Sequence, residues 1–141
     1  MLTTLSTEKL VSSDEFATLK TEPIYEKRAQ RALKFSLDNV DNVLDAYRKD
    51  DPRTGENILN KILQAVELAY ESLVATGKPA RQSPKHFKRA EIQTRRLLKQ
   101  LDGLSRNHHF DERVELTRIS QRISEINDQL LQKIMSNPRK K

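Results

Sequence analysis

The chain has 141 residues and no cysteine, so it has room for one domain with its own core, and disulfides, thiolate nucleophiles and thiolate metal sites are excluded. Hydrophobic residues make up 35% and charged residues 33%, and Leu, Ile and Val recur at helical rather than alternating spacing, which predicts an all-α protein. The net charge of +6 is compatible with binding to a polyanion or to an acidic protein, and also with a surface that faces solvent alone.

The N-terminus lacks the basic start and continuous apolar run of a secretion signal. No segment approaches the roughly 20 apolar residues that are needed to cross a bilayer. We therefore expect a cytoplasmic protein with no membrane span. Residues 1–22 form an N-terminal segment that we expect to be partly ordered. A short helix from Asp14 to Leu19 is predicted there, because Ser13 or Asp14 can cap it and Pro23 blocks its continuation.

Residues 23–136 are predicted to form a single helical-bundle domain, and its first helix begins at Pro23. Apolar residues gather on one face of this helix over about seven turns. Phe35 falls outside that face, where a neighbouring element or a partner is expected to cover it. The face comprises Tyr25, Ala29, Ala32, Leu33, Ser36, Leu37, Val40, Val43, Leu44 and Tyr47.

A second long helix is predicted to begin with Asp51 as its N-cap and Pro52 as its first residue. Gly77 supplies the left-handed stop and Pro79 prevents the helix from resuming. The apolar residues cover nearly half of the circumference, so we expect this helix to pack against two neighbours. They are Ile58, Leu59, Ile62, Leu63, Ala65, Val66, Ala69, Tyr70, Leu73 and Val74.

Ser83 and Pro84 repeat the combination of cap and proline and start a third helix, for which Gly103 is the expected C-terminal stop. A fourth helix opens near Asp111, and Asn137 and Pro138 end it. Its apolar seam has spacings of three and four residues. The seam comprises Leu116, Ile119, Ile123, Ile126 and Leu130, extended by Leu131, Ile134 and Met135. Residues 137–141 are expected to be a basic disordered tail.

Short connections between long helices favour antiparallel neighbours. We therefore predict an elongated antiparallel up-down bundle of three to four long helices, with a short N-terminal helix or irregular segment before it. The apolar stripes are long and large aromatic side chains are few. Self-association, with a homodimer as its simplest form, is therefore a further expectation.

The excess positive charge is concentrated in the third helix. Residues 80–106 contain eight Lys and Arg residues but only Glu91 and Asp102 as acids, and this segment therefore accounts for the whole net charge. A solvated helix usually interleaves more acids. Around the helix, the cations fall opposite the apolar face, with Ile92 in their middle. The candidate binding residues are Lys85, Lys88, Arg89, Ile92, Arg95, Arg96 and Lys99, with Arg81 extending the row.

This basic face has two possible binding roles. Clustered Lys and Arg can contact phosphates and give salt-sensitive nucleic-acid binding. The chain, however, lacks helix-turn-helix spacing and an aromatic platform for stacking bases, because its tyrosines fall on predicted core faces. A face that contacts protein or solvent is therefore favoured, and nucleic acid or another polyanion is the alternative.

Asp38, Asp41 and Asp45 project from the outer face of the first long helix, and carboxylates three or four residues apart can share a metal ion. The Asp-x-x-x-Asp spacing of Asp41 and Asp45 resembles a metal-binding signature of the helical-bundle regulators of phosphate uptake. The resemblance covers five residues and no accompanying motif recurs in the second half of the chain, so no function is carried over. We expect the helix pairs Lys34–Asp38 and Asp45–Lys49, and no metal or cofactor.

No catalytic motif stands out. His86, His108 and His109 lack the spacing of helical zinc ligands and are expected to be structural or loop residues. There is no glycine-rich phosphate loop, nucleophile elbow or carboxylate pair in an apolar setting. The sequence therefore favours a non-enzymatic helical bundle that acts through protein contact, as an adaptor, scaffold or regulatory module.

Overall fold

A computed structural model of the chain describes residues 15–82, 84–107 and 113–136. All regular elements in these ranges are helices, which confirms the all-α prediction. A short helix covers residues 15–20. The others are α2 (Tyr25–Asp38), α3 (Val40–Arg48), α4 (Pro52–Ala75), α5 (Pro84–Asn107) and α6 (Arg113–Met135).

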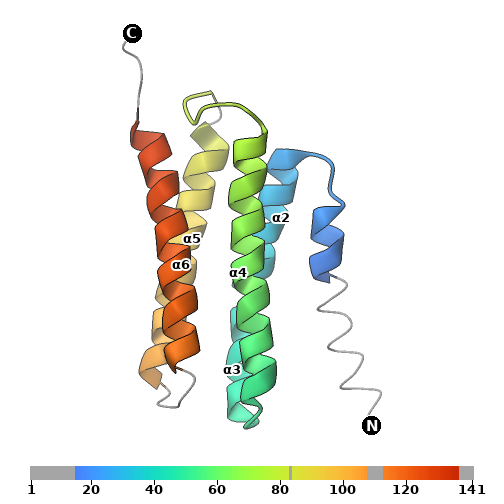
Figure 1. Cartoon of the computed structure of the whole chain (residues 1–141), viewed down its shortest axis with the longest axis vertical. Helices are drawn as coiled ribbons and strands as arrows, with labels where there is room; N and C mark the ends of the chain where they lie inside the picture. The colour runs from blue at the N-terminus through green and yellow to red at the C-terminus, as the bar shows by residue number, and fades with distance from the viewer. Residues whose placement is uncertain (1–14, 83, 108–112, 137–141) are drawn as a thin grey trace.

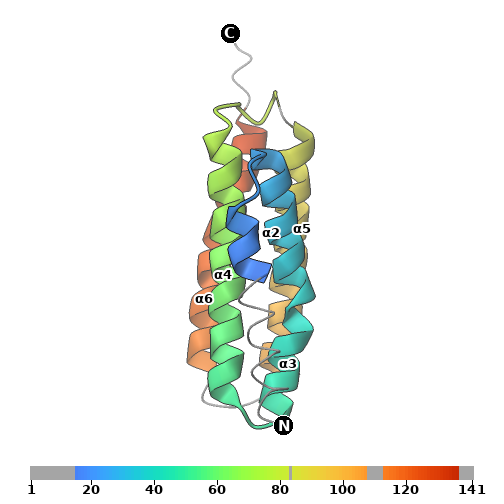
Figure 2. The same cartoon turned by 90° about the vertical axis from the view of Figure 1, so that its right-hand side faces the viewer.

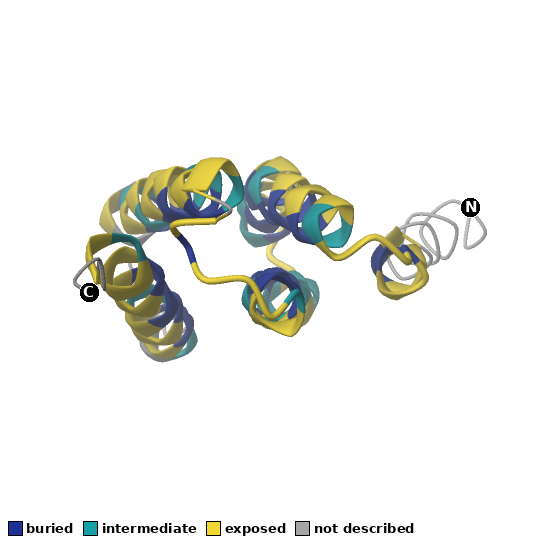
Figure 3. Ribbon diagram, turned by 90° about the horizontal axis from the view of Figure 1, so that it is seen from above, coloured by how far each residue is buried: buried dark blue, intermediate teal, exposed yellow. Residues whose placement is uncertain are grey.

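The helices form an elongated up-down bundle (Figures 1 and 2). α2 and α3 together make the first rod, and α4, α5 and α6 follow with alternating direction. The first rod packs against α4 and α5, and α6 packs against the same two helices from the other side. Seen from above, the buried residues face the inside of the bundle (Figure 3). This arrangement confirms the predicted bundle, and α4 has the two neighbours that its wide apolar face predicted.

The first rod is not the single helix that the sequence predicted, because it is interrupted at Asn39. The side-chain Nδ2 of Asn39 donates to the carbonyl of Phe35 (2.8 Å). The backbone N–H of Asn39 shares the carbonyls of Phe35 (3.1 Å) and Ser36 (3.3 Å). An asparagine that bonds to the preceding turn competes with the regular helical pattern. The prediction of one helix was therefore wrong by one local break, although the rod keeps its direction.

The helix of residues 15–20 covers Phe35, which lies outside the apolar face of its own helix. The rings of Phe16 and Phe35 lie 5.9 Å apart between centroids, and Phe16 and Leu19 are buried. The connection to α2 is held by Glu22, whose Oε1 accepts from the guanidinium of Arg31 (2.9 Å). Of the two covers expected for Phe35, a neighbouring element or a partner, the structure shows the neighbouring element, which is this short helix.

The predicted boundaries of α4 are confirmed. Asp51 precedes Pro52 and its side chain accepts hydrogen bonds from the backbone N–H (3.3 Å) and the hydroxyl (2.7 Å) of Thr54. At the other end, Gly77 adopts a φ of 73°, a conformation that glycine reaches without strain. The α6 seam is also confirmed, since all five of its central residues are almost completely buried: Leu116, Ile119, Ile123, Ile126 and Leu130.

Other expectations were wrong. α5 does not stop at Gly103 but continues to Asn107. Continuation buries Leu104 in the core and allows the helix pair between Arg106 and Asp102 (3.0 Å), and both favour the helix over an early stop. Four residues assigned to apolar faces are exposed instead, because they lie toward helix ends or at the rim of the core: Tyr25, Val74, Leu131 and Met135.

Several expectations concern residues outside the described ranges. These are the cap at Ser83, the start near Asp111, the histidines His108 and His109, and the segments 1–14 and 137–141. Among the helices that the structure does describe, none combines the length and apolarity needed to cross a membrane.

Candidate functional site

The basic face lies on α5, whose opposite side is held in the core. Phe87, Ala90, Thr94, Leu97 and Leu101 are buried and fix the rotation of the helix, so residues half a turn away must face outward. Six of the seven candidate residues are exposed, and Arg89 is half-buried. The exposed ones are Lys85, Lys88, Ile92, Arg95, Arg96 and Lys99.

Arg95 differs from the other exposed cations because it is bound to Glu91. Its Nε donates to Oε2 of Glu91 (3.0 Å) and its Nη2 to Oε1 (2.9 Å), the bidentate geometry that guanidinium and carboxylate favour. Glu91 is only 8% exposed. The hydrogen bonds from Arg95, and a further one from Asn127, lower the pKa of Glu91 below its ordinary value, although burial acts in the opposite direction.

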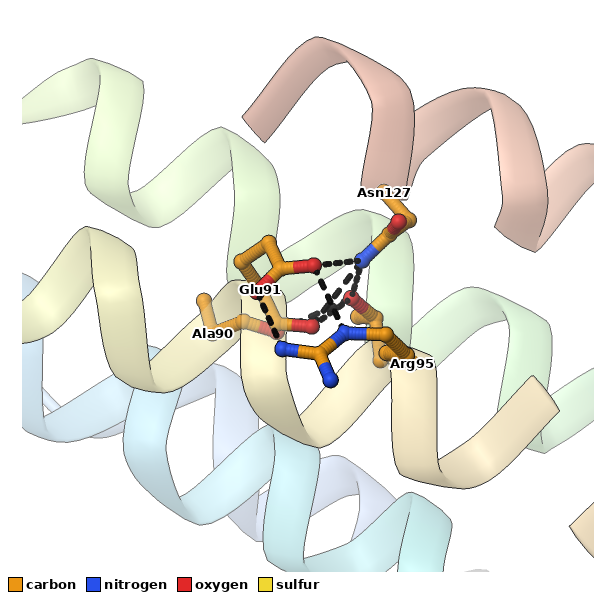
Figure 4. A network of polar contacts seen from close by, with 5 residues as sticks. Ala90, Glu91, Arg95 and Asn127 are labelled. Carbon is orange, nitrogen blue, oxygen red and sulfur yellow. Dashed lines mark hydrogen bonds and ion pairs between the residues drawn. The ribbon is translucent and has the colours of Figure 1, made fainter. Parts of the chain in front are cut away.

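Asn127 on α6 completes this network (Figure 4). Its Nδ2 lies 2.9 Å from the backbone carbonyl of Glu91 and 2.6 Å from Oγ1 of Thr94. The Thr94 hydroxyl in turn donates to the carbonyl of Ala90 (2.9 Å). These contacts are buried between α5 and α6. Arg95 therefore lies at the outer edge of a structural network, and its charge is compensated.

Neither Glu91 nor Asn127 was among the residues that the sequence predicted for the site, and Glu91 was noted only as one of two acids in the basic segment. Two signals were present. Glu91 stands four residues before Arg95, the order that favours a helical ion pair. Asn127 stands directly after Ile126 and four residues after Ile123, within the seam of α6, where a polar residue needs a partner.

The remaining cations have no such compensation. Among the described residues, Lys85, Lys88, Arg89, Arg96 and Lys99 form no ion pair with a carboxylate. Arg89 turns toward α2, where it shares a small cavity with Glu26 and Gln30. The other four surround Ile92, which is 46% exposed. We call Lys85, Lys88, Ile92, Arg96 and Lys99 the α5 strip.

The α5 strip follows a regular pattern. Its residues are separated by three, four, four and three positions, so they lie in one row along the helix, about 21 Å long at 1.5 Å per residue. Cations occupy both ends and one apolar side chain the centre. This pattern is chemically complementary to a negatively charged surface that carries an apolar residue in its middle.

The other residues that the sequence singled out are not brought together. Asp38 pairs with Lys34 (2.8 Å) as predicted, but Asp45 has no ion pair with Lys49, which lies beyond the end of α3. No group of three or more His, Asp or Glu side chains in the described ranges could hold a metal ion. His86 is half-buried on α5, whereas Asp41 and Asp45 lie on α3.

Within this geometry, α5 exposes a row of cations around Ile92. Comparison with known proteins adds no relative, since no protein-family model, curated protein or solved structure matches the chain.

Proposed function

We propose that this protein is a non-enzymatic adaptor or regulatory module that binds an acidic protein surface through the α5 strip. The observation that supports the proposal is the exposed Ile92 between uncompensated cations on a helix that the core holds in place. Elsewhere in the described chain, carboxylates stand beside many of the exposed cations, as in Lys34–Asp38 and Arg122–Glu125.

An acidic helix is the partner geometry that suits the α5 strip. The spacing of three and four residues is the spacing with which two helices meet along a seam. The cations attract a negatively charged helix, and Ile92 provides an apolar contact that is desolvated only when the partner docks. A nucleic acid would use the cations and would gain little from Ile92, so this residue distinguishes the two classes of ligand.

Fluorescence anisotropy tests the proposal with three labelled probes at two salt concentrations. The probes are a glutamate-rich amphipathic peptide with leucine along one face, a DNA duplex and a single-stranded oligonucleotide. We expect the peptide to bind best and more weakly at high salt. Substitution Ile92→Asp should weaken the binding of the peptide about tenfold, because it removes the apolar contact and adds a like charge.

The charge variant Lys88→Glu/Arg96→Glu/Lys99→Glu should abolish binding of the peptide. A matched control, Lys27→Glu/Arg48→Glu/Arg53→Glu, removes the same charge from exposed residues outside the strip and should bind within about twofold of the unmodified protein. Equal loss in both variants, or no binding at low salt, would contradict the proposal. Preferred binding of an oligonucleotide over the peptide would establish the nucleic-acid alternative instead.

Self-association stays a separate prediction. A second copy of the chain would bring another basic surface, so the α5 strip is not the face through which we expect a homodimer to form. Light scattering over a range of protein concentrations measures the molar mass directly, against 16.4 kDa for one chain.

A further inference from the structure

A groove of about 590 Å³ lies at the end of the bundle where α4 and α6 finish. Its volume falls in the range of small-molecule sites. The segment that follows α4 turns at Gly77 and contributes Pro79 and Ala80 to the groove. No residue of the α5 strip lines it, so this groove is separate from the surface proposed above.

The groove has an apolar wall. Phe87 of α5 is almost fully buried beneath it, while Val74 of α4 is exposed and Tyr70 is half-buried. The Tyr70 hydroxyl can donate a hydrogen bond, as any tyrosine hydroxyl does at neutral pH, and burial raises its pKa further. The wall therefore combines an apolar surface with one neutral donor.

The polar part of the groove is positively charged. Lys78, Arg81 and Lys133 line it, and no carboxylate does so among the described residues. Lys78 is partly compensated by Glu26 of α2, whose Oε2 lies 3.5 Å from its Nζ. Arg81 and Lys133 are exposed and have no ion pair with a described carboxylate. Two cations from different segments are therefore available to one ligand.

We propose that this groove binds an amphipathic anion, with a carboxylate or phosphate head held by Arg81 and Lys133 and an apolar body against Tyr70 and Val74. Arg81 belongs to the segment after α4 and Lys133 to the last turn of α6. The anion would thus connect the segment after α4 with the last turn of α6, at the end of the bundle where the groove lies. An apolar molecule alone would leave the cations unused, and a small anion alone would leave the wall exposed.

Nuclear magnetic resonance titration of the full chain with decanoate and with decyl phosphate, below their micelle-forming concentrations, tests this proposal. Both probes combine an anionic head group with an apolar chain. They differ in the head group, which is a carboxylate in one and a phosphate in the other. We expect amide shifts confined to residues 70–81 and 129–136 with at least one of them. Decanol, acetate and inorganic phosphate, each of which carries only half of the chemistry, should bind at least about tenfold more weakly.

The variant Arg81→Gln/Lys133→Gln should weaken the binding of the anionic probe about tenfold while the spectrum of the rest of the bundle is unchanged. Val74→Asp should weaken it as well, because a carboxylate then faces the anion. Lys85→Gln/Lys88→Gln, which removes two cations outside the groove, is the matched control and should bind normally. Equal binding of decanol and decanoate, unchanged binding by the groove variants, or shifts spread over the α5 strip would overturn the proposal.

Discussion

The side-chain amide of Asn127 on α6 donates to the backbone carbonyl of Glu91 on α5, with 2.9 Å between Nδ2 and O. Both residues are buried, and Asn127 also contacts Thr94 across the same pair of helices. Because a buried polar group costs free energy when it has no partner, the relative register of α5 and α6 that keeps this contact is favoured. The pair therefore orients the helix that carries the basic strip.

Substitution of Asn127 should destabilise the fold. Asn127→Ala removes the donor to Glu91 and Thr94 and should lower the free energy of unfolding by about 1–3 kcal/mol. Asn127→Asp should lower it further at neutral pH, because it places a second carboxylate beside that of Glu91. Urea unfolding measures both changes, with Asp128→Ala at the exposed neighbouring position as the control. A free energy equal to that of the control would show that the amide is dispensable.

Protonation of Glu91 should weaken the bundle in acid. The bonds from Arg95 lower the pKa of Glu91 in the folded protein, so this carboxylate contributes stability above its unfolded-state pKa and loses it as the pH falls through the folded value. The Glu91→Gln variant should be less stable than the unmodified protein at pH 7, and the difference should shrink below about pH 4. Urea unfolding at several pH values gives this difference directly. A difference that is independent of pH would contradict the role of the charged form.

Two glycines should respond in opposite ways to alanine. A Cβ atom on Gly55 would lie 2.6 Å from the ring of Tyr47, so Gly55→Ala should destabilise the protein although alanine favours helices. Gly103 also lies inside a helix, but a Cβ there would meet nothing within 4 Å, and Gly103→Ala should stabilise the protein by about 0.5–1 kcal/mol. Thermal unfolding compares the two. If Gly55→Ala stabilises the protein to the same degree, the ring of Tyr47 moves aside without cost.

The helix of residues 15–20 should depend on Phe16. Replacing Phe16 with alanine removes its ring from the contact with Phe35 and should cost about 2–4 kcal/mol of stability. In the Phe16→Ala variant, hydrogen exchange should show that the amides of residues 15–20 exchange faster with solvent than those of the α5–α6 pair. Glu15→Ala changes an exposed residue of the same helix and serves as the control. Protection unchanged by Phe16→Ala would show that other contacts hold the helix.

Interactions within a few residues of the chain were predictable. Asp51 and Pro52 begin α4, and Gly77 ends it, because each acts on its own turn of backbone. The seam of α6 was predictable for a similar reason, since spacings of three and four place its residues on one face of any helix. The same local reasoning failed at Gly103, where the burial of Leu104 outweighs the local preference of glycine for a helix end.

The sequence predicted which face of α5 carries the candidate site. It did not predict that Arg95 is bound to Glu91. Helical periodicity alone placed Lys85, Ile92 and Lys99 on one outward face of α5. It did not separate Arg95 from them, although Glu91 stands four residues before it, because the burial of that carboxylate and its contact with Asn127 of α6 depend on the tertiary structure. The groove beside Tyr70 was not predictable at all, since segments distant in the sequence form its walls.

Apart from the break at Asn39, the sequence by itself determined where the described helices begin and end to within a few residues, which faces are apolar, and that short connections fold them into an antiparallel bundle. Only the tertiary structure decided that Asn127 contacts Glu91, what covers Phe35 and where a groove remains open. The physical reason is distance along the chain. Caps and apolar stripes depend on neighbours within one or two turns, whereas the contact of Asn127 with Glu91 spans 36 positions and depends on how two packed helices are rotated against each other.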